Sequence, residues 1–556
     1  MAILANLLHL PLLWYCIFMT TAAPHTAVPS LLWPPNHDRA THSQGLSTQS
    51  ATDLGLSILV RALDYDGRHN NFVRGVLQAL VADPDVLRYR QTVLAELAHN
   101  EPLRAALAAL VPQLAELAQP RSAGWTQESP LTQIPPRLSD LELYVSCIET
   151  LHAVLNPDLQ SPGLQHVREY VGALHASDTF QALAQELPTL RDQLDRARSV
   201  TIGLNLDRDL RPAAGTLVAI NTEPFVGERS LAGRLLGRGQ NEGIQASKPL
   251  RDLVFGSSDT SPLARDVYHA LRDVVEPVGE VLERYQRVQA RPLAALAPEI
   301  AFYLGAIEMQ RRLHEQGLPT CLPIVTRDEH ALKEAYNPIL ALQVAGPSNN
   351  GSTPLVPNPI SFDAGRVIVL TGPNRGGKTT YLRAVALNQV LFQAGVFVIA
   401  TSARMSPVDA ILTHFPPPES TDPGGGRLDD EARRVRDMFE HGTGRSLLFF
   451  NEPLTSTAER EALVLATDVI RALQMLNART IFVTHLHALA EQIPAFNENG
   501  GATVVSWVAD VSGDTPTYTI RPGTPQSQSH ARRIAQQHGI TFDQLKSKIS
   551  ELKINS

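Results

Sequence analysis

A glycine-rich stretch between an apolar run and a segment of helical periodicity constrains the fold of this chain more than any other feature. Residues 371–380 read Thr-Gly-Pro-Asn-Arg-Gly-Gly-Lys-Thr-Thr. The spacing of Gly372, Gly377, Lys378 and Thr379 matches the phosphate-binding loop pattern. Glycines allow the backbone to curl so that successive N–H groups face phosphate oxygens, and the following helix adds its positive N-terminal end. The pattern predicts a nucleotide-binding loop between a strand and a helix; a glycine-rich turn without a ligand is the alternative.

The predicted loop assigns a role to most of its residues. Lys378 would reach the β- and γ-phosphates of a nucleoside triphosphate, and the Thr379 hydroxyl would hold Mg²⁺. The loop residues that we expect to contact the nucleotide are Gly372, Pro373, Asn374, Arg375, Gly376, Gly377, Lys378, Thr379 and Thr380.

A second apolar run, at 447–450, ends in Asn451 and Glu452. An apolar strand that delivers acidic groups beside the phosphate loop is the second element of a nucleotide hydrolase, and its usual residue at Asn451 is an Asp that binds Mg²⁺ through water. Asn keeps an oxygen but loses the charge, so we expect weaker Mg²⁺ binding or slower turnover. Glu452 is placed to orient the attacking water or accept its proton; a carboxylate that caps the next segment is the alternative.

Two further features could meet a nucleotide. A third apolar run ends in Thr484 and His485, and a His at the carboxyl end of a strand can hydrogen-bond the γ-phosphate; a structural His is the alternative. The glycine-rich stretch 424–431 opens a helix whose free N–H groups could bind phosphate. A second such helix start is useful if it serves a nucleotide held by a partner subunit, and an ordinary surface helix after a flexible loop is the alternative.

The chain is too long, at 556 residues, for a single core, and its character changes along its length. Apolar positions recur every three or four residues over 53–336, which predicts a mainly helical domain with a short β island at 199–221. Short apolar runs alternate with helices over 337–530, which predicts an α/β domain with a mostly parallel sheet, followed by a helical tail at 531–556. The apolar runs lie at 367–370, 396–399, 447–450, 480–483, 503–509 and 517–520.

Residues 1–52 carry no clear folding pattern. Residues 2–23 are largely apolar, but the first basic residue is Arg39, whereas a secretory signal needs a basic start. We therefore expect a leader without regular structure, with translation starting at Met19 or beyond, and a disordered linker at 24–52. A membrane anchor is the alternative.

Charge and cysteine content narrow the function classes. The formal net charge of −8 argues against a general, histone-like attraction to nucleic acid. The three cysteines lie far apart without metal-ligand spacing, which is typical of a reducing compartment. We expect a cytoplasmic protein.

These elements, in this order, resemble those of the MutS family of DNA mismatch-repair ATPases. The phosphate loop carries Asn374 after Gly-Pro, which is more particular to that family than the general loop pattern. The segments that carry the resemblance are 371–383, 395–400, 409–415, 482–489 and 518–535, with helical text at 88–93 and 140–151.

The resemblance implies a helical core and lever domain with a reduced clamp over 53–336, followed by an ATPase domain of ABC type over 337–530. ATP and Mg²⁺ would be the cofactors, and Glu452 and His485 the catalytic residues. It also implies a homodimer in which the 425–431 helix start of one subunit closes the ATP site of the other. DNA and a downstream repair protein would be partners, which places the protein at the nucleoid.

Departures from the family pattern limit the expected function. The Phe-x-Glu pattern of its mismatch wedge occurs only at 450–452 and 496–498, both within the ATPase region, so we expect no domain that reads mispaired bases. Arg375 stands where many members carry Met. Basic residues that could contact a DNA backbone are Arg284, Arg287 and Arg291, although a solvated helix face is their alternative.

Three hypotheses follow. The first is a MutS-like dimer that binds and hydrolyses ATP, recognises DNA shape or backbone, and acts in mismatch repair or in related control of repair or recombination. The second is a nucleotide-switched scaffold with weak or no hydrolysis that acts through a protein partner, as Asn451 and the acidic charge favour. The third is the ATPase subunit of a transporter, which the helical domain ahead of the ATPase region disfavours.

Overall fold

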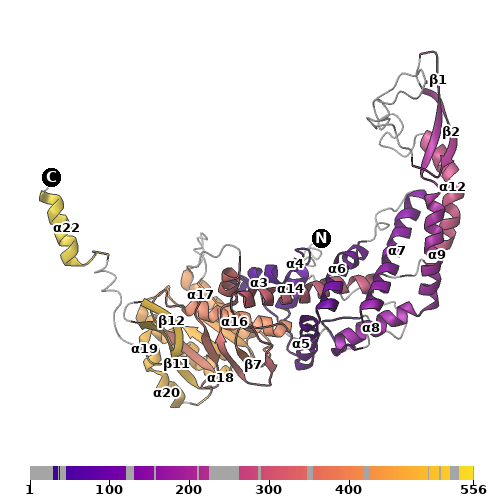
Figure 1. Cartoon of the computed structure of the whole chain (residues 1–556). Coiled ribbons are helices and arrows are strands. Elements are labelled where there is room, and N and C mark those ends of the chain that lie inside the picture. The colour runs from indigo at the N-terminus through magenta and orange to yellow at the C-terminus, as the bar shows by residue number, and fades with distance from the viewer. Residues whose placement is uncertain are drawn as a thin grey trace, which may run out of the picture. The chain divides into compact units, whose positions relative to one another are not determined.

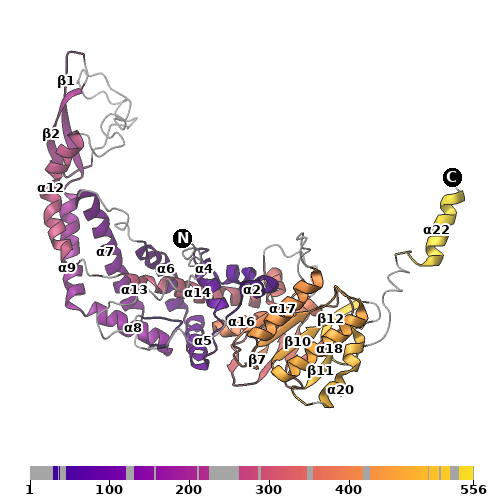
Figure 2. The same cartoon turned by 180° about the vertical axis from the view of Figure 1, so that it is seen from behind.

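The computed structural model shows two compact units, which we describe separately (Figures 1 and 2). The first contains the described residues within Met1–Arg104, Gln160–Gly163 and Pro298–Ser556, and the second those within Ala105–Leu159 and Leu164–Ala297. The described residues are 29–35, 37, 45–119, 130–155, 158–209, 212–224, 262–285, 288, 290–346, 355–416, 426–498, 500–512, 515–525 and 538–554.

The second unit is a helical assembly that ends in a β-hairpin. Its helices are α6 (Glu101–Leu117), α7 (Pro130–Val154), α8 (Pro162–His175), α9 (Asp178–Asp195), α12 (Pro262–Glu283) and α13 (Arg291–Ala294). Helices α7, α9 and α12 pack side by side (Figure 1). Their apolar positions supply the buried contacts, for example Leu141, Leu183 and Val278. The hairpin pairs β1 (Ser199–Leu206) with β2 (Pro212–Asn221) in antiparallel register, within the stretch where the sequence predicts a β island.

The first unit is built on a six-stranded sheet. Its strand order is β12-β11-β6-β10-β9-β8, and all neighbours are parallel except β11 and β12. The bounds are β6 (Val367–Thr371), β8 (Ile411–His414), β9 (Leu447–Asn451), β10 (Arg479–Val483), β11 (Val504–Ser512) and β12 (Thr515–Pro522). Every residue of β6, β9 and β10 is buried, as expected for the centre of a sheet that helices cover on both faces. The prediction of a mostly parallel sheet is confirmed.

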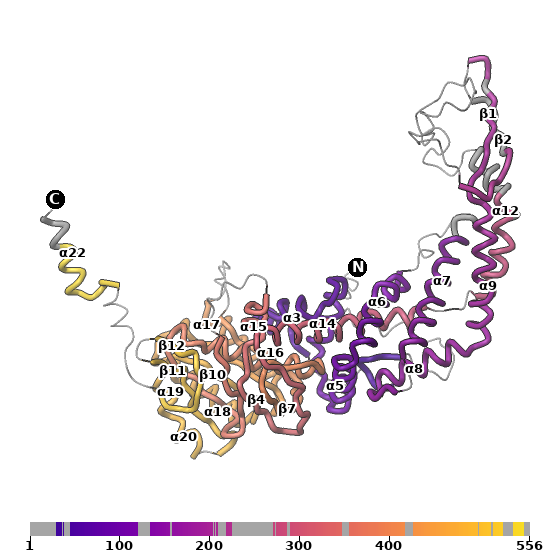
Figure 3. Tube along the Cα trace, in the orientation of Figure 1, coloured from indigo at the N-terminus to yellow at the C-terminus, as the bar shows by residue number. Residues whose placement is uncertain are grey.

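Helices cover this sheet. They are α16 (Lys378–Ala394), α17 (Arg427–His441), α18 (Glu459–Leu476), α19 (His487–Glu491) and α20 (Ile493–Glu498), and their places along the trace can be followed in Figure 3. Ile470 of α18 and Phe496 of α20 pack in one core with Phe450 and Phe482 of the sheet. The C-terminal helix α22 (Phe542–Ile554) lies within the predicted helical tail.

A second, four-stranded sheet of order β3-β7-β4-β5 is present that the sequence did not predict. Its strands are β3 (Ile324–Val325), β4 (His330–Ala335), β5 (Asn358–Ser361) and β7 (Ser402–Met405). The prediction of a strand at the apolar run 396–399 is wrong. Gly395 caps α16 in the left-handed region, and the buried run that follows makes only an isolated bridge between Val398 and Cys321.

The N-terminal helices belong to the first unit. They are α2 (Thr48–Leu54), α3 (Ser57–Leu63), α4 (Asn70–Gln78) and α5 (Pro84–His99), and they are joined there by α14 (Leu296–Glu315) and α15 (Pro338–Val344). Local sequence sets their starts. The Ser47 hydroxyl accepts a hydrogen bond from the Ser50 N–H, and the Asp83 carboxylate accepts one from the Asp85 N–H with Pro84 in the first turn.

Residues 29–35 are packed into the first unit, so the linker prediction for 24–52 does not hold there. Leu31 and Leu32 are buried. The Ser30 hydroxyl and the Leu31 N–H both donate to the carboxylate of Glu299, at 2.8 and 2.6 Å. The polar residues of this stretch resemble a linker in composition, but they serve to satisfy buried partners.

One helical stretch of the described residues, Arg291–Glu315, is long and apolar enough to cross a membrane. Because 72% of its apolar window is buried inside the protein, its composition fits a core helix. The predicted leader at 2–23 lies outside the described residues.

Candidate nucleotide-binding site

The predicted phosphate loop connects β6 to α16, as the strand–loop–helix pattern requires. Its backbone needs glycine at both ends, since Gly372 has φ 142° and Gly377 has φ 90°. A Cβ atom on Gly372 would lie 2.7 Å from the Cβ of Ala509 on β11. The Gly376 N–H bonds the Pro373 carbonyl at 3.1 Å, which tightens the curl.

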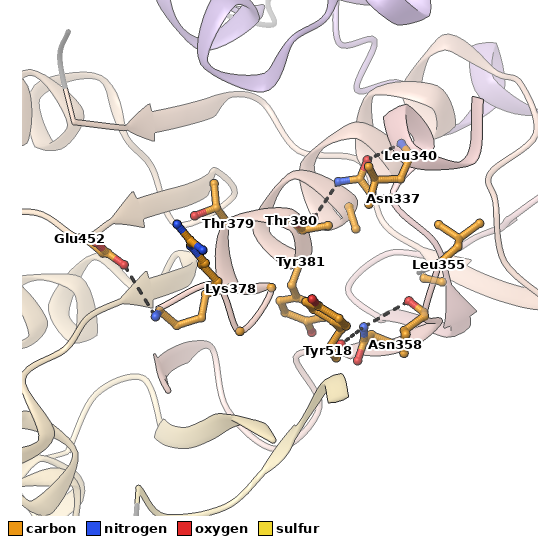
Figure 4. Close-up of a pocket in the computed structure, with 16 residues that line it drawn as sticks. Asn337, Leu340, Leu355, Asn358, Lys378, Thr379, Thr380, Tyr381, Glu452 and Tyr518 are labelled. Carbon is orange, nitrogen blue, oxygen red and sulfur yellow. Dashed lines mark hydrogen bonds and ion pairs between the residues drawn. The ribbon is translucent and has the colours of Figure 1, made fainter. Parts of the chain in front are cut away.

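Lys378 is the first residue of α16, and only 4% of its surface is exposed. Its ammonium group donates to the carbonyls of Gly372 and Pro373 at 2.9 and 3.0 Å, and it lies 3.7 Å from Glu452 Oε1 (Figure 4). Burial lowers the pKa of Lys378, and the carboxylate of Glu452 offsets part of that effect. The cation is therefore placed inside the loop that it is predicted to serve.

The two predicted metal ligands contact each other. The Thr379 hydroxyl donates to Asn451 Oδ1 at 3.0 Å. Both oxygens are neutral, whereas Mg²⁺ in proteins prefers carboxylates together with phosphate oxygens and water. Within the described residues, no group of three or more His, Cys, Asp or Glu side chains could hold a metal ion. This donor set therefore suits a Mg²⁺ ion that is held mainly by phosphates and water.

Glu452 and His485 form a hydrogen-bonded pair, which the sequence did not predict. Parallel pairing of β9 with β10 sets Val483 opposite Asn451, so the residues that follow each strand meet. His485 Nε2 lies 2.7 Å from Glu452 Oε1, and because a carboxylate only accepts, Nε2 carries the proton. This hydrogen bond is the main reason that the pKa of Glu452 lies below its ordinary value.

A pocket of about 360 Å³ opens beside the loop. Besides the loop residues 375–380 and Glu452, it is lined by Ala335, Asn337, Leu340, Leu355, Val356, Asn358, Tyr381, Ala384 and Tyr518 (Figure 4). One side is therefore charged and the other largely apolar, as a nucleotide with a phosphate chain and a base requires.

The sequence signalled only part of this apolar side. Leu355 and Val356 precede the loop in the sequence and line the pocket. Asn358 bonds the Tyr518 carbonyl at 3.0 Å and accepts from the Ile520 N–H at 2.6 Å, which fixes the far wall. Asn337 donates to the Thr380 carbonyl at 2.8 Å. Each asparagine pairs with backbone that is distant in sequence, which no local pattern reveals.

The remaining predicted contacts lie in different places. Asn374 and Arg375 are exposed on the loop. Gly426 caps the start of α17, and residues 424 and 425 lie outside the described part of the chain. Arg284 is paired with Glu186 at 3.1 Å. Arg291 opens α13, and Arg287 is outside the described residues.

Comparison with known families matches two parts of the chain. Residues 368–541 match the family model described as MutS domain V, which contains the loop, Asn451, Glu452 and His485. Residues 82–316 match the MutS2 N-terminal domain.

Curated relatives with the name DNA mismatch repair protein MutS match this chain over part of their length. The protein of Granulibacter bethesdensis is 34% identical over 210 residues, which are 37% of this chain and 22% of the relative. That of Acetivibrio thermocellus is 32% identical over 248 residues, 44% and 26% of the two chains. That of Lactobacillus delbrueckii subsp. bulgaricus is 28% identical over 315 residues, which are 54% of this chain and 33% of the relative. The chain thus spans a third or less of the length of these relatives, and the two family models that match it both describe MutS-type domains.

Proposed function

We propose that this protein binds and hydrolyses ATP as a dimer and acts on DNA, in mismatch repair or in a related repair or recombination process. The observation that carries the proposal is the meeting of Lys378, Thr379, Asn451, Glu452 and His485 at the carboxyl edge of one parallel sheet. Ligands of such sheets bind at this edge. This arrangement supports the proposal of a phosphate-loop ATPase of ABC type.

Binding of the triphosphate rests on the loop. Backbone N–H groups and the N-terminus of α16 attract the phosphates, and Lys378 exchanges its bonds to the Gly372 and Pro373 carbonyls for phosphate oxygens. Mg²⁺, when bound, neutralises charge on the β- and γ-phosphates. Thr379 and Asn451 are the residues that would hold it, directly and through water.

Glu452 is suited to orient the attacking water. Its lowered pKa means that it is ionised at neutral pH, and so it accepts a hydrogen bond from water without being a strong base. The bond from His485 Nε2 fixes the carboxylate, while the 3.7 Å contact to Lys378 ties it to the phosphate position. Hydrolysis by positioning, with modest proton transfer, fits phosphoryl transfer.

The start of α17 supports a dimeric site. Gly426 at this start has extended backbone and offers no side-chain cap, so the N–H groups of Arg427 and Leu428 stay available to an anion, whereas the Asp429 N–H bonds the Gly426 carbonyl at 2.8 Å. Gly426 is not among the described residues that line the pocket of its own chain. A second subunit would bring this helix start to the nucleotide.

The DNA part of the proposal rests on the matches to the two MutS family models and on the names of the curated relatives. The nucleotide-switched scaffold is a second candidate, because neutral Asn451 in contact with Thr379 weakens the metal site that hydrolysis needs. Both candidates require ATP binding, and they differ in turnover.

The test compares ATP affinity, turnover and self-association in three variants. Lys378→Ala should lose ATP affinity and ATP-dependent self-association, whereas Lys333→Ala, an exposed lysine on β4, should leave both unchanged. Glu452→Gln should keep binding but lower turnover about 10²–10⁴-fold. A Lys378→Ala protein that binds ATP and associates like the unaltered protein would refute the proposal. Equal, near-zero rates for the unaltered protein and Glu452→Gln favour the scaffold.

DNA binding is tested separately by titrating duplex, single-stranded and branched DNA across a range of salt concentrations. Affinity that falls steeply with salt is expected from backbone contacts. Absence of binding to all three at low salt would remove the DNA role and leave the ATP-binding part intact.

A further inference from the structure

Arg375 is the unusual residue of the phosphate loop. Its backbone has φ 64°, a left-handed conformation that glycine adopts more cheaply than any residue with a side chain. The side chain is exposed and lines the pocket beside Lys378 and Thr379. Within the described residues, neither a hydrogen bond nor an ion pair engages its guanidinium group.

The charges that line the pocket show what this group adds. Among the described lining residues the ionised side chains are those of Arg375, Lys378 and Glu452. Lys378 and Glu452 lie 3.7 Å apart and largely neutralise each other. Arg375 is therefore the uncompensated charge of the pocket. Guanidinium groups bind phosphate oxygens in a bidentate manner and keep their charge at all relevant pH values.

The predicted Mg²⁺ ligands also depart from the usual phosphate-loop pattern, because they lack a negative charge. In phosphate-loop NTPases an Asp next to the loop threonine holds Mg²⁺, but here the Thr379 hydroxyl donates to the neutral amide oxygen of Asn451. An Asp would attract the metal and repel the bare triphosphate. Relative to that arrangement the site has lost one negative charge, and Arg375 supplies a positive one. Both changes favour the phosphates over the metal.

We propose that Arg375 supplies positive charge that Mg²⁺ would otherwise provide, so that this site binds ATP with only modest dependence on Mg²⁺. The inference rests on the proposed ATP binding and specifies its cation requirement. Asn451 is its second determinant, because a neutral side chain there does not penalise metal-free ATP.

The experiment is calorimetric titration of the full chain with ATP, in excess MgCl₂ and in excess EDTA. The unaltered protein should lose less than about tenfold in affinity on chelation. Arg375→Met should lose about 10- to 100-fold in EDTA, the value of a charge-assisted phosphate contact, and much less with Mg²⁺. Arg375→Lys should keep most of the EDTA affinity. Asn451→Asp should make binding strongly Mg²⁺-dependent.

Controls separate this inference from general damage. Arg311→Met removes an arginine that is paired with Glu308 on α14, away from the pocket, and should match the unaltered protein in both buffers. At one ATP concentration in EDTA, ATP should also raise the melting temperature of the unaltered protein by more than that of Arg375→Met, and this readout does not depend on hydrolysis.

Two results would overturn the inference: chelation that abolishes ATP binding to the unaltered protein, or an Arg375→Met protein with unchanged affinity in EDTA. Either would leave the proposed function standing if ATP binds with Mg²⁺. Failure to bind ATP in both buffers would overturn the proposed function, and this inference with it.

Discussion

Two buried histidines predict that the first unit loses stability between neutral pH and mild acid. His414 at the end of β8 and His330 on β4 are 0% and 1% exposed, and within the described residues neither ring nitrogen of either has a hydrogen-bond partner. Burial lowers the pKa of His414 from 6.5 to about 4; nearby backbone groups of His414 and Glu431 oppose this shift in part, and the charge of Arg434 adds to it. Burial also lowers the pKa of His330 from 6.5 to about 3, aided by the charge of Arg479.

The direction of the change in stability with pH follows from proton binding. Below pH 6.5 the unfolded chain takes up a proton at each histidine while the fold keeps both rings neutral, so acid favours unfolding. The loss of stability begins as the pH falls to the pKa of each histidine in the unfolded chain, and it continues until the pH reaches the pKa of that histidine in the folded protein. At about pH 5.5 each unfolded ring is roughly nine-tenths protonated, which lowers the free energy of unfolding by about 1.4 kcal/mol per histidine relative to about pH 7.5.

The assay is urea unfolding at these two pH values, followed by circular dichroism and by tryptophan fluorescence, to which the buried Trp507 on β11 contributes. His414→Leu should reduce the difference between the two pH values by about 1.4 kcal/mol, and the double variant with His330→Leu by about twice that. His441→Leu is the control, since His441 is exposed on α17 and solvated in both states. If His414→Leu and His441→Leu show the same pH dependence as the unaltered protein, the argument from burial is wrong.

Two further predictions concern the joint between α5 and the end of α16. Arg90 is 1% exposed and donates to the carbonyls of residues 32, 393 and 394; Arg90→Met should therefore lower the free energy of unfolding by about 2–4 kcal/mol, against about 0.5 or less for the exposed Arg88→Met. Gly395→Ala should cost about 2–3 kcal/mol in urea unfolding, because its Cβ would lie 2.4 Å from the Cβ of Arg90 at φ 81°; Gly67→Ala, at φ 76° with no atom within 4 Å, should cost about 1 kcal/mol. Each prediction is contradicted if the variant and its control lose the same free energy of unfolding.

The parts of the fold that follow from local pattern were predictable. The loop glycines, the apolar runs of β6, β9 and β10, and the alternation with helices all specify a parallel sheet, because each is read from neighbouring residues. The residues that end β9 and β10 could be named for the same reason. That Glu452 and His485 bond each other depends on strand order, which the sequence does not state.

What could not be predicted depends on distant partners. The run 396–399 has the composition of a strand, but it is buried as an irregular segment that Gly395 turns away from α16. Strands β3 and β7 are only 2 and 4 residues long, too short for an alternating pattern. Residues 29–35 look like linker because nothing nearby reveals that Glu299 will accept their hydrogen bonds.

Helix α16 joins these predictable and unpredictable parts. Lys378 begins it at the nucleotide loop, and its other end is held by buried amides: Gln393 donates to the carbonyls of Leu80, Val81 and Val408 at 2.8–3.1 Å.

A shift of α16 along its axis would break the Gln393 bonds together with the bonds from Arg90 to the Gln393 and Ala394 carbonyls, leaving several buried polar groups unpaired at about 1–3 kcal/mol each. The helix is therefore a fixed support, about 25 Å long for its 17 residues. Any structural change on the proposed binding of ATP must then fall on the parts without such anchoring, which are the exposed Arg375 and the Lys378–Glu452 contact, or must carry α16 and α5 together as one body.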